Sequence, residues 1–96
     1  MAFALLFTDE AQEQLAHLDE TDRKKARKVR TALGRLAANP RHPGLQTHEY
    51  ITLTRAMGEK VFEAYVENQT PGAYRVFWHY GAGRNHITIL SIPPHP

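Results

Sequence analysis

The 96-residue chain has the composition of an ordinary soluble globular protein, with 42% hydrophobic, 23% charged and 9% aromatic residues. This length predicts one domain over residues 1–96, without room for a second core. The absence of cysteine excludes disulfides and thiolate zinc sites, so the cytoplasm is the expected compartment. No apolar run approaches the roughly 20 residues that span a bilayer, and the first apolar segment is too short for a secretory signal.

Positive charge is concentrated in one segment of the chain. The formal net charge is only +2, but residues 23–30 carry six cations. Such a block is typical of the solvated face of a helix, and it is also typical of a surface that attracts nucleic acid or an acidic protein. The sequence leaves both interpretations open.

The first half of the chain predicts a short strand followed by two helices. Apolar residues 3–7 are compatible with a strand, and Thr8 can cap the helix that follows. Thr21 is the expected cap of a second helix, which keeps a 3.6-residue apolar period and ends at Asn39-Pro40. The two helices are expected to be antiparallel and to lie on a sheet.

The second half predicts that sheet. Residues 50–54 are expected to form a short edge strand, and residues 60–67, 73–80 and 86–92 three further strands separated by turns. The predicted fold class is therefore α+β, with two antiparallel N-terminal helices packed on a small antiparallel sheet of about four strands, in the chain order β-α-α-β-β-β.

The strand over residues 73–80 carries two kinds of side chain on its two faces. The expected core face holds Tyr74, Val76, Trp78 and Tyr80. The other face holds Ala73, Arg75, Phe77 and His79. A guanidinium there must contact water, a partner or an anionic ligand, which makes this face the candidate working surface. The alternative is an ion pair of Arg75 with Glu63 or Glu67 on the neighbouring strand, worth roughly 0.2–1 kcal/mol.

Three segments resemble the RelE/ParE toxin superfamily. Tyr74-Arg-Val-Phe-Trp78 resembles the family's strand with a central arginine, and residues 87–92 followed by Pro-Pro-His95 resemble its last strand with a His or Arg in the tail. Residues 36–45 resemble the stretch by which the family enters its sheet. The resemblance covers nearly the whole chain, and it implies a bacterial type II toxin whose partner is a cognate antitoxin.

The resemblance implies two alternative activities. RelE-like members enter the ribosomal A site and cut messenger RNA without a metal, whereas ParE-like members inhibit DNA gyrase. The histidine in the tail and the face with Arg75 and His79 favour the ribosome-dependent endoribonuclease. A non-enzymatic gyrase inhibitor, or an inactive relative that only binds its antitoxin, remains the alternative. No cofactor is expected for either activity.

Metal-free RNA cleavage needs a base for the 2′-OH, a cation for the phosphorane and an acid for the leaving 5′-oxygen, and it yields a 2′,3′-cyclic phosphate and a 5′-OH. Arg75 suits the cationic role, because a guanidinium binds two phosphate oxygens at once. His95 suits the acid or base role, with His79 or Glu63 as the assisting base. The residues expected to contact flanking RNA are Arg55, Lys60, Tyr65 and Arg84.

The six histidines also raise a zinc alternative. His79 and His86 flank a tight turn, and His42 and His48 lie in the loop region. None of them follows a recognised helical His spacing, and no cysteine is present. The sequence therefore predicts no metal site.

Overall fold

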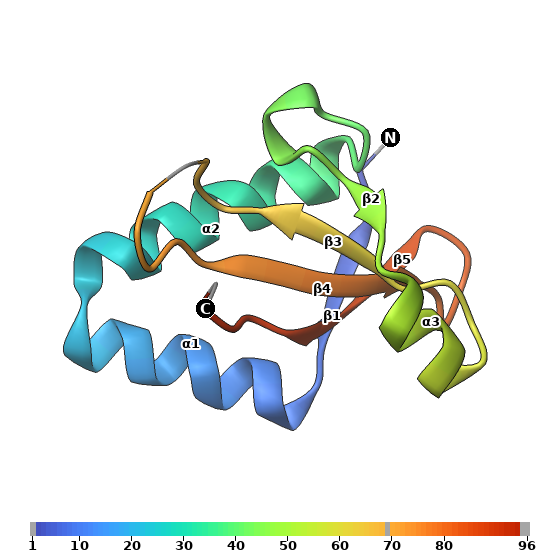
Figure 1. The fold of residues 1–96 in the computed structure, drawn as a ribbon, viewed down its shortest axis with the longest axis horizontal. Helices are drawn as coiled ribbons and strands as arrows, with labels where there is room; N and C mark the ends of the chain where they lie inside the picture. The colour runs from blue at the N-terminus through green and yellow to red at the C-terminus, as the bar shows by residue number, and fades with distance from the viewer. Residues whose placement is uncertain (1, 69, 95–96) are drawn as a thin grey trace.

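A five-stranded sheet forms the centre of the protein (Figure 1). The structure is a computed structural model that describes residues 2–68 and 70–94. Its strands are β1 (Ala4–Phe7), β2 (His48–Glu49), β3 (Phe62–Tyr65), β4 (Arg75–Tyr80) and β5 (His86–Ser91). They lie in the order β1-β5-β4-β3-β2, and β1 pairs with β5 in parallel while the other pairs are antiparallel. The α+β class is confirmed, and the parallel β1 makes the sheet mixed.

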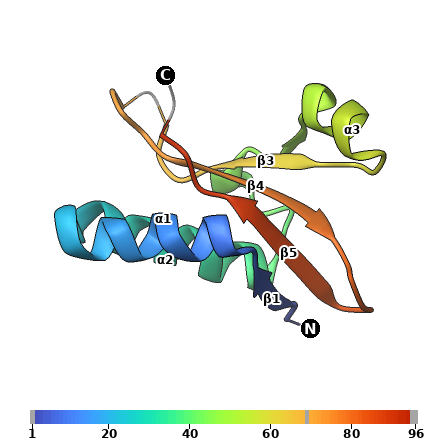
Figure 2. The ribbon, with the colours of Figure 1, turned by 90° about the horizontal axis from the view of Figure 1, so that it is seen from below.

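Two antiparallel helices, α1 (Asp9–Thr21) and α2 (Arg23–Ala38), cover one face of this sheet. Figure 2 shows them on one side of the strands, with the short helix α3 (Ile51–Met57) on the other side. The core between the helices and the sheet includes Val29 and Leu36 from α2 and Trp78, Ile87 and Ile89 from the strands. None of the helices in the described residues is both long and apolar enough to cross a membrane.

The starts of both helices are fixed by side-chain caps. The hydroxyl of Thr8 accepts a hydrogen bond from the backbone N–H of Ala11 at 3.1 Å, which confirms Thr8 as the cap of α1. The cap of α2 is Asp22, whose Oδ1 accepts from the N–H of Lys25 at 3.1 Å. The expectation that Thr21 caps α2 is wrong, because Thr21 still belongs to α1 and donates its hydroxyl hydrogen back to the carbonyl of His17.

The segment after the α2 loop differs from the strand expected over residues 50–54. Only His48 and Glu49 pair with β3, and the chain then turns into α3. The backbone N–H of Tyr50 donates to the carbonyl of Val61, and the N–H of Val61 donates to the hydroxyl of Thr54. These contacts with the start of β3 favour a helical turn, which ends at Gly58 with a positive φ of 77°.

Strand β4 is buried on both faces, not on one. Phe77 is only 4% exposed although it lies on the face away from α1 and α2, because the ring of Tyr50 packs 4.9 Å from its own ring. Tyr80, expected in the core, is 47% exposed at the end of the strand, where it borders Phe3 and Phe62. Val76 and Trp78 are buried as predicted.

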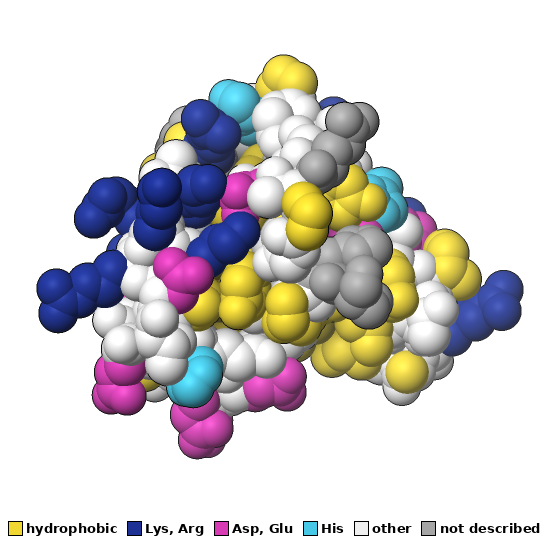
Figure 3. Space-filling view, turned by 60° about the vertical axis from the view of Figure 1, so that its left-hand side comes forward, with side chains coloured by type: hydrophobic (Ala, Val, Ile, Leu, Met, Phe, Trp, Pro, Cys, Tyr) yellow, Lys and Arg dark blue, Asp and Glu magenta, His cyan; other side chains and the backbone are white. Residues whose placement is uncertain are grey.

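Part of the positive charge of α2 is neutralised by carboxylates. Lys25 and Lys28 both contact Glu67, just beyond β3, at 2.5 and 2.8 Å, and hydrogen bonds from these two ammonium groups hold the pKa of Glu67 below its ordinary value. A hydrogen bond from Arg30 lowers the pKa of Asp19 in the same way. Many Lys and Arg side chains gather on one side of the molecule in the space-filling view of Figure 3, where they are dark blue, and others lie at the opposite edge.

Candidate active site

The register of β3 and β4 brings several predicted side chains onto one face of the sheet. Tyr65 lies opposite Arg75, and Glu63 lies opposite Phe77, so all four side chains share the face away from α1 and α2, called the open face. His79 follows on the same face by alternation along β4. The predicted placement of Arg75, His79, Glu63 and Tyr65 on one surface is therefore confirmed.

Arg75 is held in place on the open face by an ion pair. Its Nη1 donates to Oε2 of Glu63 at 2.7 Å, and its guanidinium carbon lies 4.9 Å from the ring centre of Phe77. Its Nε is buried and has no hydrogen-bond partner among the described residues. The contact with Glu63 uses one of five N–H donors, so the group keeps capacity for an anion.

Glu63 is buried between two basic side chains. It is 3% exposed, and its Oε1 lies 2.8 Å from Nε2 of His48 while its Oε2 accepts from Arg75. A carboxylate in such a position is stabilised by charge-assisted hydrogen bonds. Both oxygens are engaged, which makes Glu63 better suited to positioning Arg75 than to taking a proton from RNA.

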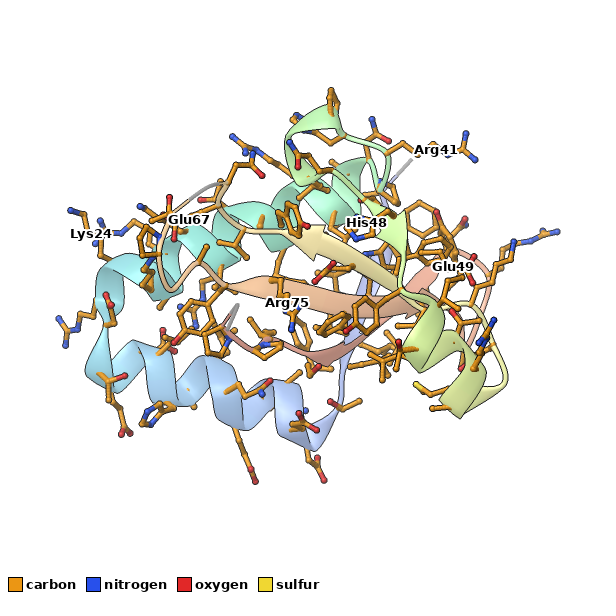
Figure 4. All side chains as sticks on the ribbon, viewed as in Figure 1. Lys24, Arg41, His48, Glu49, Glu67 and Arg75 are labelled. Atoms are coloured by element: carbon orange, nitrogen blue, oxygen red, sulfur yellow. The ribbon has the colours of Figure 1, made fainter. Side chains whose placement is uncertain are left out.

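His48, which the sequence interpretation placed only in a loop, completes this group (Figure 4). Its side chain is 47% exposed, its Nδ1 lies 2.9 Å from the carbonyl of Gln46, and its ring meets that of Tyr65 edge-on. Both ring nitrogens thus face acceptors, so both contacts are hydrogen bonds only when both nitrogens carry a proton. No local pattern marks this residue, because its place opposite Glu63 depends on the two-residue pairing of β2 with β3.

His79 lies one step further along the open face, beyond Phe77. Its Nδ1 is 2.9 Å from the carbonyl of Tyr80, and its Nε2 is 3.3 Å from Oε1 of the half-exposed Glu59. That longer contact to a solvent-exposed carboxylate is the weaker of the two. His79 is therefore more easily released for proton transfer than Glu63 is.

The other predicted positions fall into two groups. Arg55 in α3, Lys60 before β3 and Arg84 in the β4–β5 turn are exposed, and they lie near the end of the sheet where β3 begins and β4 ends, away from Arg75. His95 lies outside the described residues. The described tail reaches Pro94, which pairs with Tyr74 next to Arg75.

The described residues show no metal centre. No group of three or more His, Asp or Glu side chains within residues 2–68 and 70–94 is arranged to hold a metal ion. His86, considered with His79 for zinc, instead has its Nδ1 2.9 Å from the carbonyl of Arg84. In the β4–β5 pairing, His79 lies opposite Thr88 rather than opposite His86.

Comparison with solved structures identifies the fold. A YoeB/ParE toxin from Agrobacterium tumefaciens is similar with a TM-score of 0.73 and 8% identity, over 97% of this chain and 99% of that chain. The chain has the fold of the RelE/ParE toxin superfamily. The YoeB dimer from Staphylococcus aureus (TM-score 0.67, 16% identity) and the heterotetrameric YoeB–YefM toxin–antitoxin complex from the same organism (0.72, 15%) match over the full length of both chains.

No family model and no curated protein matches the chain. The structural likeness confirms the predicted fold. At 8–16% identity, this likeness shows a shared fold and not a shared activity or shared site residues.

Proposed function

We propose that this protein is the toxin of a bacterial type II toxin–antitoxin system and acts as a metal-independent, ribosome-dependent endoribonuclease on messenger RNA. The observation that carries the proposal is the fixed guanidinium of Arg75 on the open face, held by Glu63 with His48 behind it. A preorganised cation of this kind stabilises the charge that develops on a phosphorane without reorganising during the reaction.

The proposed reaction divides the roles among five residues. Arg75 binds the scissile phosphate, while Glu63 and His48 fix its orientation. A base removes the 2′-OH proton, the 2′-oxygen attacks phosphorus, the bond to the 5′-oxygen breaks, and an acid protonates that oxygen. His95 is proposed for one of the two proton transfers and His79 for the other, because both oxygens of Glu63 are already engaged by His48 and Arg75.

The partner of such a toxin is proposed to be an acidic antitoxin, with the ribosome and its message as the target. The similar Staphylococcus aureus YoeB was solved in a heterotetramer with the antitoxin YefM, which supports an antitoxin partner for this chain. Exposed Arg23, Lys24 and Arg27 on α2 provide charge complementary to an acidic segment.

Non-enzymatic inhibition of DNA gyrase is the second candidate. One observation favours it: the charge of Arg75 is already compensated by a buried carboxylate, which weakens its attraction for phosphate. One of the similar structures is described as a YoeB/ParE toxin, so the fold is compatible with either branch.

The deciding experiment adds the purified protein to a cell-free translation mixture and maps messenger ends by primer extension. Cuts in phase with codons, lost in Arg75→Ala and retained in the α2 surface variant Arg27→Ala, are the expected result. Circular dichroism checks that both variants are folded. Intact message together with blocked DNA supercoiling would overturn the nuclease assignment in favour of the gyrase inhibitor.

A further inference from the structure

A pocket of about 370 Å³ lies between the loop that follows α2 and the aromatic ends of β3 and β4. The residues that give it its chemistry are Arg41, His42, His48, Phe62, Trp78 and Tyr80. Apart from His48, these residues lie outside the cluster on the open face. Its volume falls within the range of small-ligand sites.

The wall of the pocket is aromatic. Phe62 stacks on Trp78 with ring centres 4.8 Å apart, and Tyr80 stands edge-on to Trp78 at 4.9 Å. Tyr80 keeps about half of its surface exposed, and the N–H of Trp78 is buried without a hydrogen-bond partner among the described residues. An exposed aromatic ring at the mouth of a pocket is a surface on which a planar base can stack, whatever its identity.

The rim of the pocket is basic. Arg41 is exposed and extends from the loop beside β2 (Figure 4), and no lining residue carries a carboxylate. Nδ1 of His42 accepts from the backbone N–H of Gly44, so the proton of the neutral ring lies on Nε2, which is a donor. A ligand with an anionic group and acceptor atoms is complementary to this rim.

The loop that forms the rim is preorganised. The hydroxyl of Thr47 donates to the carbonyl of Pro40 across the base of the loop at 2.9 Å, and the backbone N–H of Leu45 donates to the carbonyl of His42. Leu45 is 1% exposed and anchors the loop in the core. A rigid rim lowers the entropy lost when a ligand binds.

We propose that this pocket binds one unpaired nucleotide of an RNA strand, with the base against Tyr80 and Phe62 and the phosphate on Arg41. The inference rests on the proposed function for the identity of the strand. His48 lines the pocket and also contacts Glu63 beside Arg75, so the bound nucleotide flanks the phosphate that Arg75 holds. The pocket would thereby hold the base next to the cleavage point.

Binding can be measured directly because Trp78 is the only tryptophan in the chain and lies in the pocket wall. The purified protein is titrated with each of the four nucleoside 5′-monophosphates, and tryptophan fluorescence is recorded. A saturable change is expected, with a dissociation constant on the order of 1 mM. The free nucleosides should bind more weakly, and inorganic phosphate alone should give no change. No response to any nucleotide, or an equal response to inorganic phosphate, would overturn the proposal.

Two variants and a matched control assign the response to the pocket. Arg41→Gln is expected to weaken nucleotide binding about fivefold or more by removing a charge-assisted contact, and Tyr80→Leu to weaken binding of all four nucleotides through loss of stacking. Arg27→Gln removes the same charge from the exposed surface of α2 and should bind as the unchanged protein does. Equal affinities in Arg41→Gln and Arg27→Gln would contradict the assignment.

Failure of this inference is separable from failure of the proposed function. The fluorescence titration uses no ribosome and no cleavage, and Arg75→Ala should retain nucleotide binding while it loses cleavage. Cleavage of messenger RNA without nucleotide binding would contradict the proposed nucleotide site and leave the proposed nuclease function standing. Nucleotide binding together with unchanged cleavage by Arg75→Ala would contradict the catalytic role of Arg75 and leave the proposed nucleotide site standing.

Discussion

Nη1 of Arg75 donates to Oε2 of Glu63 over 2.7 Å, across two neighbouring strands on the same face of the sheet. The pair joins the residue proposed to bind phosphate to a carboxylate that water hardly reaches. The same contact that gives the guanidinium a fixed direction also offsets its charge. The ion pair therefore affects both the stability of the fold and the proposed activity. Substitutions at Arg75 and at Glu63 test these two effects one at a time.

Arg75→Lys is expected to lower the rate of messenger cleavage by about 10²–10³-fold, because an ammonium cannot bind Glu63 and two phosphate oxygens in the planar geometry of a guanidinium. The protein should remain folded, since the positive charge opposite Glu63 is kept. Primer extension gives the rate and thermal unfolding the stability. A rate within threefold of the unchanged protein's, well below the expected loss, would contradict a transition-state role for Arg75.

Glu63→Gln is expected to lower the free energy of unfolding by about 3 kcal/mol, because it leaves the largely buried guanidinium of Arg75 without its counter-charge. Urea unfolding measures the difference. The double substitution Glu63→Leu with Arg75→Met should recover at least half of the loss, because it removes both charges of the pair. A single variant as stable as the unchanged protein would show that the pair is not a structural contact in solution.

Glu67→Gln tests whether the contacts of Glu67 contribute to the free energy of unfolding in a way that depends on pH. The pKa of Glu67 is lowered in the folded protein. Its contacts with Lys25 and Lys28 therefore stabilise the fold fully at pH values above the ordinary glutamate pKa of about 4.5. This stabilisation is lost as the pH falls through the lowered pKa of the folded state. The variant is expected to be less stable by about 0.5–1 kcal/mol at pH 7. The difference between the variant and the unchanged protein should shrink below pH 4.5 in urea unfolding, and a difference that does not change with pH would contradict a charge-dependent contact.

Asp22→Ala and Thr21→Ala test which residue caps α2. Asp22→Ala is expected to lower the free energy of unfolding by about 1 kcal/mol, because the first turn of α2 loses its side-chain acceptor. Thr21→Ala should stay within about 0.5 kcal/mol of the unchanged protein, since Thr21 is an exposed residue in the last turn of α1. The reverse order of the two effects in urea unfolding would contradict the structure.

His95→Ala is expected to slow cleavage by about 10²–10⁴-fold if this residue transfers a proton in the proposed reaction. His86→Ala is the matched control, because His86 lies at the start of β5 and has no part in the proposed chemistry. Single-turnover cleavage separates the chemical step from ribosome binding. Equal rates for the two variants would leave His95 without a catalytic role.

Local signals were sufficient to predict most of the fold. A threonine before an acidic first turn predicts the start of α1, and the alternation over residues 73–80 predicts β4 and places Arg75 and His79 on one face. Such features depend on neighbours within a few residues, which is why a single sequence reveals them.

The sequence failed where distant contacts decide the local structure. Ile51, Thr52 and Thr54 are β-branched and favour a strand, yet they form α3 because Tyr50 and Thr54 bond to Val61. The same holds for His48, whose position beside Glu63 depends on the pairing of β2 with β3. The residues that complete the candidate site were thus the ones least visible in the sequence.

The parallel pairing of β1 with β5 joins residues near opposite ends of the chain, Ala4 with His86 and Phe7 with Ile89. In the described sheet, β1 is an edge strand whose only neighbour is β5, and β5 in turn lies between β1 and β4. Because contacts between residues so far apart in sequence form late in folding, β1 is held in the sheet only once β5 is in place. A substitution that unfolds β5 would therefore release β1 and leave β4, the strand that carries Arg75, with β3 as its remaining neighbour.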